Sequence, residues 1–277
     1  MAPHPSIRPP DRRLMTRALT AAVIIGVLLG VLYMPPVAFA VAASVVLLIG
    51  WNEFSRLLQA LGVDIAAAPG ALVALALANS FLDGPSAAML VLLVAVPLLA
   101  LATLRDNYGD PRRLTFAIAG GFAGLAWLAI PMGAQIGIRY HNDGIAWLLF
   151  LYASVALGDS AAYYGGSRFG QHRLAPDLSP KKSIEGSVFG IVGSAAGGLA
   201  LSPWIPGLPL WQAALVGAGL GLVGQAGDLI ESSLKRTAGR KDSADLLPGH
   251  GGVLDRIDAH LPAGALLYAI LRTGVLG

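Results

Sequence analysis

Long apolar runs uninterrupted by charge are the feature that most limits how this chain can fold. A helix needs roughly 20 residues to cross a hydrocarbon core about 30 Å thick, and several of the runs reach that length. The runs are continuously apolar rather than alternating, which excludes a transmembrane β-barrel and leaves helices that pair their own backbone groups. The sequence therefore predicts an all-α integral membrane protein with about nine transmembrane helices. The nine runs are Met15–Met34, Pro36–Leu58, Ile65–Leu82, Ser86–Leu104, Leu114–Gln135, Gly144–Leu157, Gly186–Ser202, Leu210–Leu229 and Leu261–Leu276.

The composition agrees with a large lipid-facing surface. Only 13% of the 277 residues are charged and 55% are hydrophobic, whereas a soluble domain carries roughly 25% charged residues. The chain has no cysteine, which excludes a disulfide framework, a Cys-ligated zinc site and a thiol nucleophile. We expect one polytopic membrane domain over residues 1–277. Its N-terminal helical half (1–142) has few polar residues, and its second half (143–277) carries the polar loops and the catalytic groups.

The basic residues predict the orientation of the spans. If the N-terminus is cytoplasmic and the chain crosses nine times, all but two of the 19 Lys and Arg residues lie in cytoplasmic segments, the exceptions being Arg139 and Arg272. This bias is the positive-inside pattern of multi-pass proteins. We therefore expect a protein of the cell (inner) membrane with its active site on the cytoplasmic side. A signal peptide cleaved near Ala40 is the alternative, but the apolar run continues past Pro35 and Pro36.

The seventh run carries a stripe of small residues. Gly186, Gly190, Ser194 and Gly198 recur every four residues, so they share one helix face. Small faces let helix backbones approach closely, and the stripe therefore predicts tight helix packing. Such faces permit a homodimer without requiring one.

The second run ends in the block Trp51, Asn52, Glu53 and Phe54. Tryptophan is enriched where a membrane helix meets water. We expect this block to be an interfacial aromatic anchor with Glu53 in solvent; a functional role is the alternative.

The eighth run has polar residues on a single face. Gly217, Gly221, Gln225, Asp228 and Ser232 are spaced by four, four, three and four residues, so they line up along the helix. Asp228 lies about 27 Å from the start of this helix, near the inner surface. An ionisable residue on an inward face is costly there and indicates function. A carboxylate paired with a basic neighbour for structural reasons is the alternative.

The segment between the eighth and ninth runs interleaves acids with cations beside apolar helices. A loop that only binds anionic lipid is basic throughout. Mg²⁺ takes carboxylate oxygens together with phosphate oxygens, and Lys and Arg hold further phosphate charge. Asp255 and Asp258 are three residues apart and would share a face if the ninth helix begins there. The acids are Glu231, Asp242, Asp245, Asp255 and Asp258, and the cations are Lys235, Arg236, Arg240, Lys241 and Arg256.

Glycines and a histidine stand in the same loop. Gly249, Gly251 and Gly252 allow backbone N–H groups to approach an anion. A phosphate-monoester nucleophile is ionised near neutral pH and needs no general base, so we interpret His250 as a phosphate or loop-positioning donor. A turn histidine bonded to backbone is the alternative. The sequence has no HExxH or Walker pattern, so zinc-protease and P-loop functions lack support.

Longer blocks of these residues resemble a known family. One block reads Ser-x-Leu-Lys-Arg from Ser232, then Lys241-Asp242, then Pro-Gly-His-Gly-Gly-x-x-Asp-Arg-x-Asp ending at Asp258. A second begins at Gln225 with Gln-x-Gly-Asp-Leu-x-Glu-Ser, and a third runs from Asp159-Ser160-x-Ala-Tyr to Ser-Pro-x-Lys-Ser ending at residue 183. Together they resemble the signature of the phosphatidate cytidylyltransferase (CDP-diacylglycerol synthase) family. Ser167 and Gln171 depart from that pattern, in which members often carry a base.

The resemblance implies an activity and a set of site residues. CTP and phosphatidic acid would give CDP-diacylglycerol and pyrophosphate, with Mg²⁺ as cofactor; a second, monovalent cation is not excluded. The partners would be CTP, phosphatidic acid and the lipid bilayer, and no nucleic acid is expected. The implied catalytic residues are Asp228, Asp255, Lys241 and Arg256. The metal ligands would be Asp228 and Asp255, with Asp242, Asp258 and Glu231 as further candidates. The substrate- or phosphate-binding candidates are Asp159, Lys182, Ser183, Gln225, Ser232, Lys235, Arg236, His250, Gly251 and Gly252.

Other functions remain as alternatives. The nearest is a CTP-dependent membrane lipid kinase of the polyprenol type, which would pass on the γ-phosphoryl group of CTP. A transporter would need ionisable residues near the bilayer midplane, and the nine runs contain none there. A polybasic membrane anchor is disfavoured because acids are interleaved with the cations.

Overall fold

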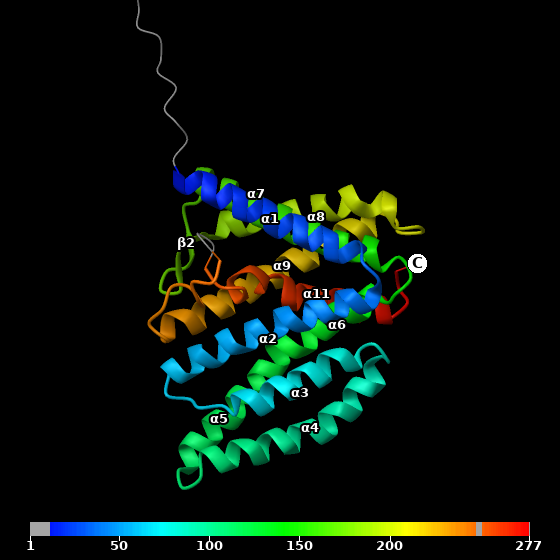
Figure 1. Cartoon of the computed structure of the whole chain (residues 1–277). Coiled ribbons are helices and arrows are strands. Elements are labelled where there is room, and N and C mark those ends of the chain that lie inside the picture. The colour runs from blue at the N-terminus through cyan, green and yellow to red at the C-terminus, as the bar shows by residue number, and fades with distance from the viewer. Residues whose placement is uncertain (1–11, 248–250, 277) are drawn as a thin grey trace, which may run out of the picture.

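The computed structural model describes residues 12–247 and 251–276, and helices dominate it (Figure 1). Between α7 and α8 the chain forms one antiparallel hairpin, in which Arg173 of β1 pairs with Ser183 of β2. A π-helical turn (Leu125–Ala129) joins α5 to α6, and a 3-10 turn (Ser202–Trp204) follows α8. The elements are α1 (Arg12–Tyr33), α2 (Pro36–Ala60), α3 (Ala67–Ser80), α4 (Pro85–Asp106), α5 (Pro111–Gly124), α6 (Ile130–Arg139), α7 (Gly144–Phe169), β1 (Arg173–Ala175), β2 (Ser179–Ser183), α8 (Ile184–Leu201), α9 (Leu210–Thr237), α10 (Leu254–Ile257) and α11 (His260–Arg272).

Six helical segments of the described chain are long and apolar enough to cross a membrane. The predicted class, an all-α membrane protein, is therefore confirmed. Among the described residues, the apolar stretches Leu19–Tyr33 of α1 and Ala67–Ser80 of α3 are shorter than a full span, and the count of nine crossings and the side of the N-terminus stay predictions. The six segments are Pro36–Ala60, Pro85–Arg105, Pro111–Arg139, Gly144–Phe169, Ile184–Trp204 and Leu210–Thr237.

Local chemistry explains where several helices begin. Pro36 and Pro111 occupy the first turns of α2 and α5, where a missing backbone N–H costs nothing. Asp110 caps α5, since its carboxylate accepts hydrogen bonds from the backbone N–H groups of Arg112 and Arg113. A side-chain oxygen in this place satisfies donors that the first helical turn leaves unpaired.

Two helices extend well beyond the predicted apolar runs. The sixth apolar run ends at Leu157, whereas α7 continues to Phe169; the eighth run ends at Leu229, whereas α9 continues to Thr237 and so keeps Ser232 on the helix, as expected. Each glycine of α7 after residue 157 costs about 1 kcal/mol of helix stability, but these glycines pack closely against Ser183 and α8, and that packing offsets the cost. The polar residues that follow each apolar run therefore stand on regular helices rather than in loops.

The small residues of α8 pack tightly against α7 and α9, as predicted. A Cβ atom at Gly190 would lie 3.1 Å from the Cβ of Ala162 on α7, and one at Gly217 would lie 2.6 Å from the carbonyl oxygen of Ser194. Larger side chains at these positions would force the three helices apart. The stripe therefore serves packing inside the protein.

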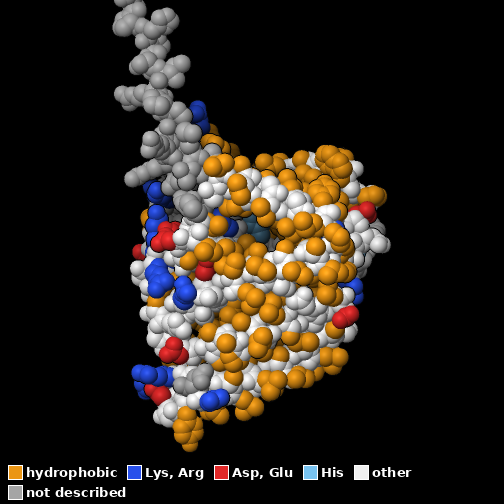
Figure 2. Space-filling view, viewed as in Figure 1, with side chains coloured by type: hydrophobic (Ala, Val, Ile, Leu, Met, Phe, Trp, Pro, Cys, Tyr) orange, Lys and Arg blue, Asp and Glu red, His pale blue; other side chains and the backbone are white. Residues whose placement is uncertain are grey.

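The polar loops gather at one end of the helical bundle, which we call the loop end. The hairpin, the C-terminal end of α9, the segments 238–247 and 251–253 and the C-terminal end of α2 all lie there (Figure 1). Hydrophobic side chains cover the broad face between the two ends, and charged side chains collect mainly at the loop end (Figure 2). A membrane-embedded bundle needs this separation, because ionised groups are expensive in hydrocarbon.

Candidate functional site

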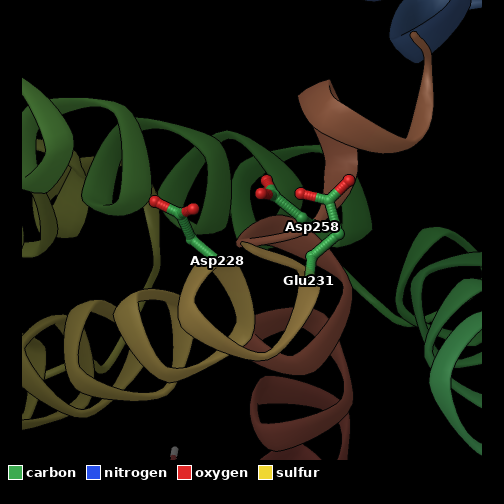
Figure 3. Close-up of side chains that lie close together, drawn as sticks. All are labelled: Asp228, Glu231 and Asp258. Atoms are coloured by element: carbon green, nitrogen blue, oxygen red, sulfur yellow. The ribbon is translucent and has the colours of Figure 1, made fainter. Parts of the chain in front are cut away.

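Three carboxylates converge at the loop end. Asp228 and Glu231 lie one turn apart on α9, and Asp258 lies between α10 and α11; one oxygen of each lies within 4.8 Å of the others. All three side chains project to the same side of α9 (Figure 3). Burial, together with the negative charge of Asp228, raises the pKa of Asp258 to about 6. Like charges at this spacing need a cation or a proton between them.

Two lysines lie against this acidic group. The Nζ atom of Lys182, on β2, is 2.5 Å from Oδ2 of Asp228. The Nζ atom of Lys235 is 2.6 Å from Oε2 of Glu231 and 2.5 Å from Oδ1 of Asp255, and both carboxylates are buried. A buried ammonium between two buried carboxylates provides the charge compensation that each needs.

Both carboxylate oxygens of Asp255 accept hydrogen bonds from other groups of the protein. Its Oδ1 atom accepts from Lys235, and its Oδ2 atom accepts from the N–H and the hydroxyl of Ser243 and from the N–H of Gly252, at 2.8 to 2.9 Å. Burial opposes ionisation, but these donors hold the pKa of Asp255 below its usual range. The expected pair of metal ligands, Asp228 and Asp255, thus lies at one end of the protein, with Asp255 linked to the acidic group through Lys235. Their sharing of a metal stays a prediction.

Glu53 of α2 is a member of this site that sequence reasoning missed. Its side chain is only 5% exposed. Oε1 accepts from the N–H of Val253, and Oε2 accepts from the N–H of Leu254 and the hydroxyl of Ser243. The expectation that Glu53 is solvated is therefore wrong. A signal existed in the sequence, because Glu53 lies four residues before Leu57, on the buried face of α2.

Several predicted site residues have structural contacts close to the carboxylates. Ser183 caps α8 by accepting from the backbone N–H three residues on. Gln225 donates to the carbonyl of Ser187 and so joins α9 to α8. The hydroxyl of Ser232 donates to Asp228 at 3.3 Å. These contacts place the three residues beside the acidic group without assigning them to a substrate.

The remaining predicted residues differ in exposure. Gly251 has a positive φ of 78°, which favours glycine there, and Gly252 is buried against Glu53. His250 lies outside the described residues. The exposed members are Asp159, Arg236, Lys241, Asp242 and Arg256.

The donor set fits a hard divalent cation. Carboxylate oxygens are the ligands that Mg²⁺ prefers, usually with waters and substrate phosphates completing its shell. Oε1 of Glu231 is buried and meets no amine, amide or hydroxyl donor among the described residues, and the Glu231 carboxyl contacts that of Asp258, with which it must share a proton or a cation. A buried carboxylate oxygen without a donor is costly, and a cation would satisfy it. Lys182 and Lys235 lie beside the same group, where phosphate oxygens could meet them.

Comparison with known proteins gives a consistent family relationship. A family model described as "Cytidylyltransferase family" matches residues 15–273. A protein of Synechocystis sp. named phosphatidate cytidylyltransferase is 30% identical over 283 residues, covering 91% of this chain and 94% of the relative. One of Staphylococcus haemolyticus with the same name is 32% identical over 266 residues, covering 93% and 99%. One of Brucella suis, also so named, is 44% identical over 125 residues, so that match spans about half the length of that relative (46%) and 45% of this chain.

Proposed function

The chain belongs to the cytidylyltransferase family, and from this premise we propose that it transfers the cytidylyl group of CTP to phosphatidic acid. The products are CDP-diacylglycerol and pyrophosphate. The observation that carries the proposal is the acidic group of Asp228, Glu231 and Asp258, with two lysines in contact, at the polar end of apolar helices. Full-length relatives named for this activity support it.

In the proposed reaction, a phosphate oxygen of phosphatidic acid attacks the α-phosphorus of CTP in line. The bond from the α-phosphorus to the oxygen bridging to the β-phosphorus breaks, and pyrophosphate leaves with that electron pair. The attacking phosphate is already ionised, so no side chain has to remove a proton. Positioning and charge stabilisation therefore make up most of the catalysis.

The acidic group would hold Mg²⁺, which when bound neutralises phosphate charge and orients the triphosphate. Asp228 belongs to both the pair expected from the sequence and the group of three. Ligation by Asp255 as well requires Lys235 to leave its carboxylate. A substrate phosphate is a partner that would draw the ammonium away. A second, monovalent cation stays a prediction.

Lysines and arginines around the acidic group would bind the remaining phosphate charge. Lys182 and Lys235 are in direct contact with the carboxylates, while Lys241 and Arg256 lie exposed on the neighbouring segments. These four cations would stabilise the departing pyrophosphate. We therefore propose that Lys241 and Arg256 act as catalytic residues by stabilising phosphate charge, as expected from the sequence.

The apolar helices would keep the acyl chains of phosphatidic acid in the bilayer while its headgroup reaches the loop end. We place that end in the cytoplasm of a cell-membrane protein, where the basic segments are expected and where CTP is made available. A homodimer stays a prediction, because the small residues that suggested one are used between α7, α8 and α9.

The test is transfer of label from CTP to lipid by purified protein in detergent with phosphatidic acid and Mg²⁺. Cytidylyl transfer moves an α-phosphate label into the lipid, whereas the alternative lipid kinase would move only a γ-phosphate label. We expect Asp228→Asn and Asp255→Asn each to lower turnover about 100-fold or more, because a metal contributes several kcal/mol to such reactions. Asp83→Asn, at an exposed turn between α3 and α4, serves as control. Incorporation of γ-label, or full activity in both variants, would refute the proposal.

A further inference from the structure

Glu53 is separated from Val253 and Leu254 by about 200 residues of chain, yet its carboxylate accepts hydrogen bonds from the backbone N–H groups of both. Oε1 lies 3.0 Å from the backbone nitrogen of Val253, and Oε2 lies 2.8 Å from that of Leu254. Val253 directly precedes α10, and Leu254 is the first residue of this helix, one position before Asp255. The N-terminal half thus contacts the catalytic segment through a buried, charged side chain.

A serine hydroxyl connects Glu53 to Asp255. The Oγ atom of Ser243 lies 2.8 Å from Oε2 of Glu53 and 2.9 Å from Oδ2 of Asp255, so its one hydrogen is shared between two carboxylates. Ser243 is 1% exposed, which keeps water from replacing this link. The backbone passes close above Glu53, since a Cβ atom at Gly252 would lie 2.5 Å from its Oε2.

We infer that Glu53 is a positioning residue for the transfer proposed above, on which this inference rests. By binding Ser243, Val253 and Leu254, it fixes the segment that directs Asp255 toward Lys235. Among the described residues, its hydrogen bonds go to Ser243, Val253 and Leu254 and to no member of the acidic group. Its effect on chemistry runs through the orientation of Asp255 and Lys235.

The site requires a carboxylate rather than an amide. Three donors converge on Glu53, two backbone N–H groups and one hydroxyl, and an ionised carboxylate can accept from all of them. Glutamine keeps the shape but presents an NH₂ group to one of the backbone N–H groups. A donor facing a donor in a buried place loses a hydrogen bond and leaves both groups unsatisfied.

Limited trypsin digestion tests the positioning directly, without reference to turnover. Arg240 and Lys241 are exposed in the segment that Glu53 holds. We expect Glu53→Gln to raise the rate of cleavage after these residues about tenfold or more, since a charged hydrogen bond of this kind is lost. Ser55→Ala is the matched control, because Ser55 is also buried on α2 but donates to the carbonyl of Asn52.

Kinetics supply the second readout. We expect Glu53→Gln to lower kcat about ten- to a hundredfold while KM for CTP changes less than about threefold. Ser243→Ala should produce part of the same loss, and the two substitutions together should cost less than the product of their separate effects, because they break one connected unit. Glu53→Asp keeps the charge and should fall between wild type and Glu53→Gln in both readouts.

Three outcomes would overturn the inference. One is wild-type cleavage and turnover in Glu53→Gln. Another is a rise in the cleavage of Glu53→Gln at sites throughout the chain, with a matching fall in its melting temperature, which would mean a general packing role. If Glu53→Gln does not fold, the same measurements on Glu53→Asp decide the question. The third is an equal increase in trypsin cleavage after Arg240 and Lys241 in Asp228→Asn. We expect that variant to be inactive but to be cleaved at the wild-type rate. Failure of the proposed reaction would leave the trypsin result intact, so the two failures can be told apart.

Discussion

Lys235 compensates two carboxylates that have little contact with water. Its ammonium group bonds to Glu231 and Asp255, whose residues are 1% and 9% exposed. Replacing it with methionine keeps much of the volume but leaves both acids without their cation. Removing one partner of a buried ion pair costs about 3 to 5 kcal/mol. At about 2 to 4 °C per kcal/mol for a protein of this size, we expect Lys235→Met to melt about 6 to 20 °C lower.

The assay is thermal unfolding in detergent at neutral pH, with EDTA or with saturating Mg²⁺. Lys181→Met, an exposed lysine on the hairpin, is the control and should melt within about 2 °C of wild type. If the acidic group binds the metal, saturating Mg²⁺ should recover part of the loss in Lys235→Met. A ligand at 100 times its dissociation constant stabilises by about 2.7 kcal/mol.

The pH dependence provides an independent check. Lys235 helps to hold the pKa of Asp255 low, so its stabilisation is present above the carboxyl group's ordinary pKa of about 3.9 and is lost as pH falls through the lowered value. The melting-temperature deficit of Lys235→Met should therefore stay constant between pH 7.5 and pH 5 and narrow as the pH falls below about 4, where Asp255 takes up a proton. A melting temperature within 2 °C of wild type in EDTA at pH 7.5 would refute the charge-compensation argument.

Two further changes separate binding from packing. Lys182→Ala should lower turnover at least tenfold and leave the melting temperature nearly unchanged, because its pair with Asp228 is partly exposed and such pairs contribute under about 1 kcal/mol; an unchanged turnover would remove Lys182 from the site. Gly217→Ala should destabilise by about 1 to 3 kcal/mol through overpacking against α8, whereas Gly219→Ala, with only a side-chain atom of Leu266 at 3.7 Å, should not. Equal melting temperatures for the two glycine variants would contradict the packing account.

Periodic features of the fold were predictable from the sequence because each depends on spacing within one helix. The apolar runs predicted most of the helices, and the four-residue stripe on α8 predicted the close packing seen at Gly190. The shared face of Gln225, Asp228 and Ser232 on α9 follows from the same 3.6-residue period. The hairpin before α8 has no such period, and its strands of three and five residues gave no signal.

Helix boundaries near the site were harder to predict. Asp255 and Asp258 were expected to share a face if the ninth helix began there. Instead α10 ends at Ile257 and the next helix begins at His260. Asp258 and Ala259 keep right-handed helical dihedrals between the two helices, yet the two carboxylates have different neighbours, since Asp255 accepts from Ser243 while Asp258 joins the acids of α9. The neighbours of each carboxylate depend on the tertiary packing of α10 and α11, which the hydropathy pattern of the sequence does not reveal.

Charge balance connects these observations to the proposed cofactor. The acidic group and Asp255 together have four carboxylates, and two lysine ammonium groups are in contact with these four, so full ionisation of the four would leave an excess of two negative charges among these six groups. Burial, together with the negative charge of Asp228, raises the pKa of Asp258 to about 6, so a proton can neutralise part of the excess when no other cation is bound. A divalent ion carries the same charge as the excess and would replace the proton. The lysines would then be free to meet phosphate, while Glu53, satisfied by its own three donors, would hold Asp255 in place throughout.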